Sequence, residues 1–179
     1  RDFVDRGGGL VFIAGARNNP AKYRDGSLAA VLPIVVDRNA EQDARTDTAE
    51  GCGFVVTADG AESPMMNVAG DPGESRRLWS THPKWRHYWS YPALRAKTLA
   101  KVLAESDDPA AENRFGRRPL IATMPFGRGR SLFVGVDELW RMRWDVGDRY
   151  FYRFYGEAVR FLATYKLLGG NKRFKIMTD

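Results

Sequence analysis

The feature that most constrains the fold of this sequence is the stretch of residues 127–168, where a short apolar run leads through a polar segment into an amphipathic one. The β-prone run at residues 131–136 follows a glycine-containing turn, which predicts a buried strand. Apolar residues then recur at helical spacing, and Asp148 offers an N-cap, which together predict a helix over residues 148–168. A strand followed by a helix is half of a β-α-β unit, so the stretch predicts an α/β fold. In such sheets ligands usually bind just past the carboxyl ends of the strands.

Residues upstream add further predicted strands. Residues 7–15 open with three glycines and continue as an apolar run, which is typical of a central strand covered on both faces. Residues 34–36 and 53–57 predict two more short strands, and residues 27–32 predict a short helix. The pattern from residue 99 to residue 136 predicts a three-strand antiparallel meander. Residues 37–51 are polar, and we expect them to form a surface loop.

Residues 74–91 are rich in aromatic side chains and show no clear period. We expect them to form a long connection that packs against the core. If the tryptophan faces were exposed, the same segment would favour a carbohydrate- or peptide-binding domain. The tryptophans concerned are Trp79, Trp85 and Trp89.

The bulk composition is that of a single globular domain. The 179 residues are 44% hydrophobic and 28% charged, as in an ordinary soluble protein. The sequence opens at Arg1, and residues 1–6 resemble the last turn of a helix, so we expect the single domain of residues 1–179 to be a piece of a longer protein. No apolar run approaches the roughly 20 residues needed to span a bilayer. Periplasmic and cytoplasmic locations are both left open.

The formal net charge of +6 is unevenly distributed along the chain. Residues 1–113 carry 14 Lys/Arg and 16 Asp/Glu, whereas residues 114–179 carry 14 and 6. A basic half of this kind is one mark of nucleic-acid binding. Here the arginines are interleaved with predicted core aromatics instead of forming a run, which is more typical of a solvated basic face. We therefore do not expect a nucleic-acid partner.

Few residues offer catalytic or metal-binding chemistry. Cys52 precedes a predicted strand, whereas a nucleophile elbow follows one, and a small buried hydrophobe is the commoner role of such a cysteine. His82 and His87 are five residues apart, which is not the spacing of a helical zinc pair, and a catalytic zinc needs three protein ligands. The glycines of residues 7–9 and 127–129 do not follow a strand and open a helix, as a phosphate loop requires. We expect no metal and no cofactor.

Charged and large aromatic side chains gather directly after the strand at residues 131–136. One interpretation is a pocket in which arginines hold an anion or carboxylate and a tryptophan face offers stacking. The interpretation that we favour is a structural corner, in which Asp137 forms an ion pair with Arg141 or Arg143. The turn-rich loop of residues 15–20 adds the polar side chains of Arg17 and Asn18. The candidate ligand-binding residues are Arg17, Asn18, Asp137, Trp140, Arg141 and Arg143.

Several short blocks, taken in order, resemble the class I glutamine amidotransferase-like superfamily, and more narrowly the amidotransferase-like domains of large bacterial membrane-associated proteins. The resemblance covers nearly the whole chain, and its C-terminal block is the most specific part. It implies a flavodoxin-like, mainly parallel sheet with flanking helices and an antiparallel meander. It also implies that the first β-α-β unit of the fold lies upstream of Arg1. The blocks are GGGLVFI at residues 7–13, PLIA at 119–122, GRGR at 127–130, DELWRMR at 137–143 and YRFYGEAVRFL at 152–162.

The resemblance also implies where catalytic groups would stand. Active members carry a cysteine after the first of these strands and a histidine after the strand at residues 131–136. Those positions fall at residues 15–17 and at Asp137, and neither holds a thiol or an imidazole, so no thioester could form there. The resemblance therefore implies a non-catalytic recognition or scaffolding module of a larger bacterial protein. Its partners would be other domains of that protein, or a protein, a small anion or a carbohydrate. The alternative is an active amidotransferase or hydrolase whose nucleophile lies elsewhere.

We expect the purified chain to release no ammonia from glutamine, because residues 15–17 and Asp137 supply neither a nucleophile nor an imidazole base. The Cys52→Ala variant should fold normally and behave in the same way. A coupled ammonia assay on both proteins measures this. Ammonia release above a buffer blank that disappears in Cys52→Ala would show that a cysteine nucleophile operates after all.

Overall fold

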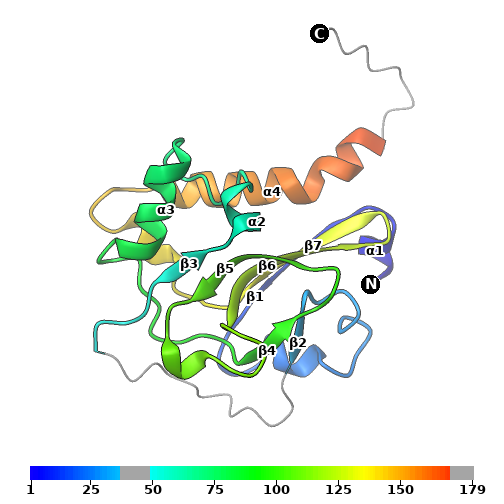
Figure 1. Cartoon of the computed structure of the whole chain (residues 1–179). Helices are drawn as coiled ribbons and strands as arrows, with labels where there is room; N and C mark the ends of the chain where they lie inside the picture. The colour runs from blue at the N-terminus through cyan, green and yellow to red at the C-terminus, as the bar shows by residue number, and fades with distance from the viewer. Residues whose placement is uncertain (37–48, 170–179) are drawn as a thin grey trace, which may run out of the picture.

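The structure is a computed structural model that describes residues 1–36 and 49–169, so the loop expected at residues 37–51 lies largely outside the described residues. Its centre is a five-stranded sheet with the spatial order β1-β7-β6-β5-β3 (Figure 1). Within the described residues, β1 and β7 run parallel, and the other three neighbouring pairs are antiparallel. In chain order the five strands are β1 (Gly9–Ile13), β3 (Phe54–Val56), β5 (Lys101–Ser106), β6 (Pro119–Phe126) and β7 (Gly129–Val134).

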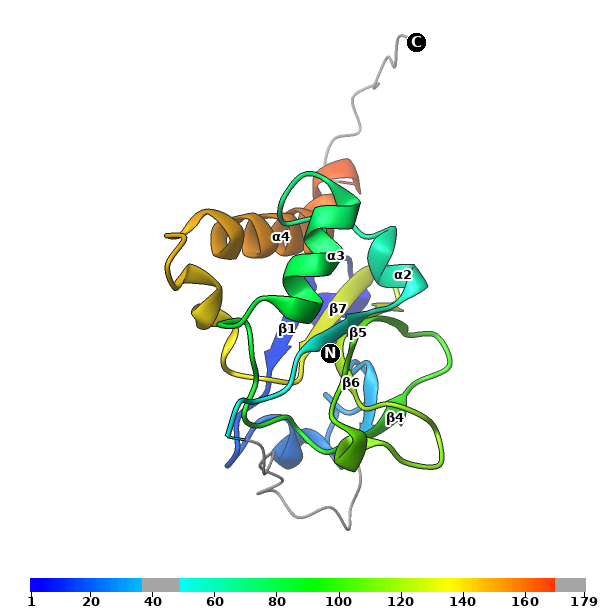
Figure 2. The ribbon, with the colours of Figure 1, turned by 60° about the vertical axis from the view of Figure 1, so that its left-hand side comes forward.

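The remaining elements cover the two faces of this sheet. Helices α2, α3 and α4 lie on one face, and a two-stranded antiparallel sheet, β2 with β4, lies toward the other (Figures 1 and 2). Among the described residues, no helix combines the length and the apolarity that a membrane crossing requires. These elements are α1 (Asp2–Asp5), β2 (Ile34–Val36), α2 (Ala58–Ala61), α3 (Pro72–Thr81), β4 (Ala93–Ala96) and α4 (Arg149–Gly169), with short 3-10 turns at Ala21–Tyr23, Pro109–Ala111 and Leu139–Arg143.

The sheet separates two apolar cores. Successive side chains of a strand point to opposite faces, and β7 shows the consequence clearly. Leu132 and Val134 belong to the core beneath the helices, together with Phe154 of α4. Phe133, between them, belongs to the second core, where it packs edge-on against Tyr91 at 6.2 Å between ring centroids. The middle of the sheet is therefore buried on both faces.

The α/β class and the antiparallel meander are confirmed. β5, β6 and β7 follow one another in sequence and in space, and Gly127 forms the tight turn between β6 and β7 with a φ of 55°, which favours glycine. The expectation of a mainly parallel sheet is wrong for the described residues, in which β1–β7 is the one parallel pair. The central position expected for β1 is also wrong. β1 lies at the edge of the described sheet, with Val11 and Ile13 exposed.

The helix predictions succeeded where the apolar period was long. α4 begins at Arg149, as the spacing predicts. Residues 27–32 form turns instead of a helix. α3 was missed, because Ser75 and Trp79 are its two buried residues and leave little periodic signal. Its local start signal is nevertheless present: the Asp71 side chain accepts a hydrogen bond from the N–H of Glu74 at 2.7 Å, and a proline follows Asp71.

Phe154→Ala should lower the free energy of unfolding by about 3–5 kcal/mol, because the Phe154 ring is fully buried and packs against Trp79 at 5.8 Å. Phe161→Ala, on the same helix, should cost clearly less. Phe161 is only partly buried, and its ring faces the Arg130 guanidinium at 4.5 Å. Chemical denaturation of the two variants measures the difference. Equal losses would mean that α4 presents a different face to the sheet.

Candidate functional site

The parallel pairing of β1 and β7 brings two predicted parts of the site together, just past the carboxyl ends of these strands. Ile13 of β1 is in register with Val134 of β7. Ala16 and Asp137 each lie three residues beyond these partners, just past the carboxyl ends of the two strands. The structure therefore forms the corner that the sequence predicts, at the place where α/β sheets usually bind ligands.

The loop after β1 folds back on itself. The N–H of Gly15 donates to the carbonyl of Asn19 at 2.8 Å, and the Asn19 side-chain amide donates to the carbonyl of Ile13. Arg17 and Asn18 stand exposed between these anchor points. Both candidate side chains are thus presented to solvent by a closed loop.

After β7, Asp137 and Glu138 have different surroundings. Asp137 is exposed, and it forms no ion pair with a described residue, so the expected tie to Arg141 or Arg143 is wrong. Glu138 is half-buried and accepts a hydrogen bond from the N–H of Tyr88 at 2.9 Å. Burial raises the pKa of the Glu138 carboxyl, against the opposing effect of the Tyr88 N–H. Glu138 therefore joins the corner to the segment before β4.

The two candidate arginines that follow β7 are already engaged by other partners. Arg143 forms an ion pair with Asp148 at the start of α4. The Arg141 guanidinium lies over three aromatic rings, at 4.8 Å from Tyr88, 5.0 Å from Trp140 and 5.7 Å from Trp144. Trp140 and Trp144 stack on each other at 5.8 Å and remain 48% and 45% exposed. What the corner offers a partner is thus an aromatic surface backed by a cation, and not a free arginine pair.

Cys52 and His87, which also have reactive side chains, are buried in the fold. Cys52 is buried, and its backbone pairs with that of His87. His87 is inaccessible to solvent, and its Nε2 lies 3.2 Å from Ser106 Oγ. Burial lowers the pKa of His87 to about 4, although the Asp107 carboxylate acts in the opposite direction. Within residues 1–36 and 49–169, no three His, Cys, Asp or Glu side chains gather closely enough to hold a metal ion.

The aromatic segment of residues 74–91 provides no tryptophan face for a sugar or peptide. Trp79 and Trp85 are 0% and 2% exposed, and Trp89 is 8% exposed. Trp79 packs edge-on against Trp85 at 5.6 Å and donates its indole N–H to the carbonyl of Met66 at 2.9 Å. The carbohydrate-binding alternative for this segment is therefore wrong: the segment builds the core.

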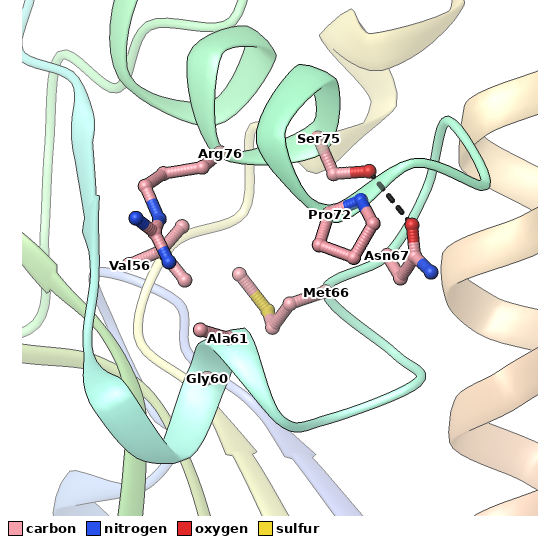
Figure 3. A pocket seen from close by; sticks show the side chains of 8 residues that line it. All are labelled: Val56, Gly60, Ala61, Met66, Asn67, Pro72, Ser75 and Arg76. Atoms are coloured by element: carbon pink, nitrogen blue, oxygen red, sulfur yellow. Dashed lines mark hydrogen bonds between the residues drawn. The ribbon is translucent and has the colours of Figure 1, made fainter.

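A small cavity lies beside α2 and α3 (Figure 3). Its volume of about 10 Å³ is roughly the space of one water molecule, so it cannot admit an organic ligand. Ser75 Oγ donates a hydrogen bond to Asn67 Oδ1 across 3.0 Å at its rim. The lining residues are Val56, Gly60, Ala61, Met66, Asn67, Pro72, Ser75 and Arg76.

Comparison with known proteins identifies the fold but no family. No family model and no curated protein matches the chain. Among solved structures, the chain is similar to the cytoplasmic protein STM3548 of Salmonella typhimurium, with a TM-score of 0.60 and 19% identity over 90% of this chain and 57% of that one. It is also similar to the cytoplasmic protein STM1381 of Salmonella typhimurium LT2, with a TM-score of 0.52 and 21% identity over 90% and 58%. The chain thus spans less than three-fifths of either neighbour.

Asp137→Ala should change the free energy of unfolding by no more than about 0.5 kcal/mol, as for an ordinary surface substitution. Glu138→Ala, one residue on, should cost about 1–3 kcal/mol, because the Tyr88 N–H would lose its acceptor in a half-buried position. Thermal and chemical denaturation of the two variants test this contrast. A larger loss in Asp137→Ala than in Glu138→Ala would restore the ion-paired corner.

Proposed function

We propose that this chain is a non-catalytic α/β module, of flavodoxin-like and class I amidotransferase-like ancestry, that recognises or scaffolds other segments of a longer bacterial protein. Ala16 supplies no nucleophile at the corner, and the exposed Asp137 has no nucleophile to activate. The parallel pairing of β1 with β7, and the packing of α4 on both strands, support the flavodoxin-like assignment. The observation that carries the scaffolding role is the outer edge of β1.

Backbone hydrogen bonds fix which side of β1 is unpaired. The carbonyl of Gly8 accepts from Arg130 N at 3.3 Å, and Ala14 N donates to the carbonyl of Val134 at 2.7 Å. Both even-numbered positions therefore face β7. Because successive peptide groups of a strand alternate in direction, the N–H groups of Val11 and Ile13 point away from β7. No described strand lies on that side.

The side chains along this edge are apolar and exposed. Val11 is 36% exposed and Ile13 is 43% exposed. A Cβ atom on Gly9 would lie 2.5 Å from Leu162, so the odd-numbered positions of β1 lie on the α4 face of the sheet. Parallel strands are usually covered on both faces and flanked on both sides. A free, apolar edge of this type is a template for a further strand.

The occupant that we propose is a parallel strand, with a helix that covers Val11 and Ile13 beside α4, supplied by another segment of the same longer protein. The solved neighbours support this choice, because more than two-fifths of each lies outside the part that matches this chain. The Asn19 amide already occupies the carbonyl of Ile13. Pairing with the incoming strand therefore depends mainly on the backbone of Gly9 and Val11.

Hydrogen–deuterium exchange with residue-level mass spectrometry tests the docking edge. In residues 1–179 expressed alone, the amides of Val11 and Ile13 should exchange fast. In the polypeptide that the gene encodes, they should become protected. Leu10 and Phe12, whose backbone faces β7, provide the internal control and should be protected in both proteins. Fast exchange of Val11 and Ile13 in both proteins would overturn the proposed docking edge.

A further inference from the structure

A second, larger cavity lies on the side of the sheet away from α4. Its volume is about 410 Å³, within the usual range of small-molecule pockets. It is open to solvent and is bounded by the end of β4, the residues that follow β4, the end of β6 and the turn before β2. The lining is mostly apolar with two cationic side chains, and consists of Ala30, Arg95, Lys97, Thr98, Leu99, Met124, Pro125 and Phe126.

Lys97 has an unusual environment for a lysine. Its side chain is partly buried, and its Nζ donates to the carbonyl of Ala29 at 2.5 Å. It forms no ion pair with a described residue, and burial lowers the pKa of its ammonium. A lysine ammonium has three N–H donors, so two remain available to a ligand. Partial burial without a carboxylate partner disfavours the charged form of Lys97, and a nearby anion would favour it, so this position suits an anion.

Lys97 also stands between two cavities. It lines the 410 Å³ cavity and a neighbouring one of about 220 Å³, which is otherwise mostly apolar. Ala29, whose carbonyl Lys97 contacts, lines the smaller cavity, and Ala30 lines the larger one. Lys97 and this turn therefore form the wall that the two cavities share.

Arg95 supplies a second cation to the larger cavity. It is exposed, its guanidinium lies 5.6 Å from the centre of the Phe115 ring, and it donates to the carbonyl of Ala96 at 3.1 Å. Like Lys97, it has no carboxylate partner among the described residues. Two cations at one cavity without an acid between them leave positive charge that a ligand can neutralise. A guanidinium matches the planar, two-oxygen geometry of a carboxylate.

We propose that this cavity binds a small organic carboxylate with an apolar body. Lys97 and Arg95 would hold the carboxylate, and Leu99, Met124 and Phe126 would cover the apolar part. Inorganic phosphate would satisfy the cations but leave the apolar walls uncovered, so an amphipathic acid fits better. This site lies away from the corner of β1 and β7 and does not depend on the docking edge.

An NMR titration of the ¹⁵N-labelled chain with 4-phenylbutanoate tests the site, with the uncharged 4-phenylbutanamide as the matched probe. We expect saturable shifts at the amides of Ala30, Thr98 and Leu99. The amide probe should bind at least about tenfold more weakly, since it lacks the charge-assisted hydrogen bonds. Lys97→Gln should weaken carboxylate binding by a similar factor. Lys84→Gln should leave it unchanged, because Lys84 is exposed and its ammonium lies 5.5 Å from the Trp144 ring at the corner after β7.

Several outcomes would overturn the proposal. These are no saturable binding up to about 10 mM, equal binding of the two probes, shifts confined to other residues, or full binding by Lys97→Gln. The amide spectrum of Lys97→Gln shows whether that variant folds. If it does not, Arg95→Gln decides in its place, because Arg95 is exposed and its substitution should leave the fold intact. Carboxylate binding by Arg95→Gln as tight as that of the unaltered chain would then reject the site.

Discussion

The burial of the β6–β7 hairpin on both faces is the constraint on which the rest of the structure depends. Leu132 and Val134 face the helices, and Phe133 faces the opposite core. A slip of one residue in the pairing would exchange these sets, so the register is strongly specified. β1 takes its position by parallel pairing with β7, and α4 crosses the same two strands. The candidate corner, the open edge and the second core all take their places from this hairpin.

The sequence predicted those elements whose signal is local and repeated. The meander and α4 could be recognised, because alternation over six residues and a helical period over twenty are strong patterns. The edge position of β1 could not, because the same apolar run is compatible with a central or an outer strand. α3 was missed for a related reason: it buries one large side chain, Trp79, and so shows no stripe. What decided these cases was tertiary packing.

The candidate site shows the same division between position and role. The parallel pairing of β1 and β7 placed Arg17 and Asp137 just past the carboxyl ends of these two strands, as expected. It could not show that Arg143 would pair with Asp148, or that Arg141 would lie among three aromatic rings. The cavity beside Lys97 was beyond sequence reasoning, because Ala30, Lys97 and Met124 come from three distant segments. No local spacing connects them.

The burial of His87 makes the interior of this protein sensitive to acid. Burial lowers its pKa from the ordinary 6.5 to about 4. At pH values between these two, the unfolded chain therefore binds a proton at His87 that the folded chain does not bind. The resulting stabilisation, about 3 kcal/mol, is complete above pH 6.5 and fades as the pH falls toward 4. Its source is the free-energy cost of placing a charge on the buried His87 ring, which packs against Phe54. Acidification from pH 6.5 toward 4 should therefore lower the free energy of unfolding, because the buried His87 ring beside Ser106 would have to carry a charge.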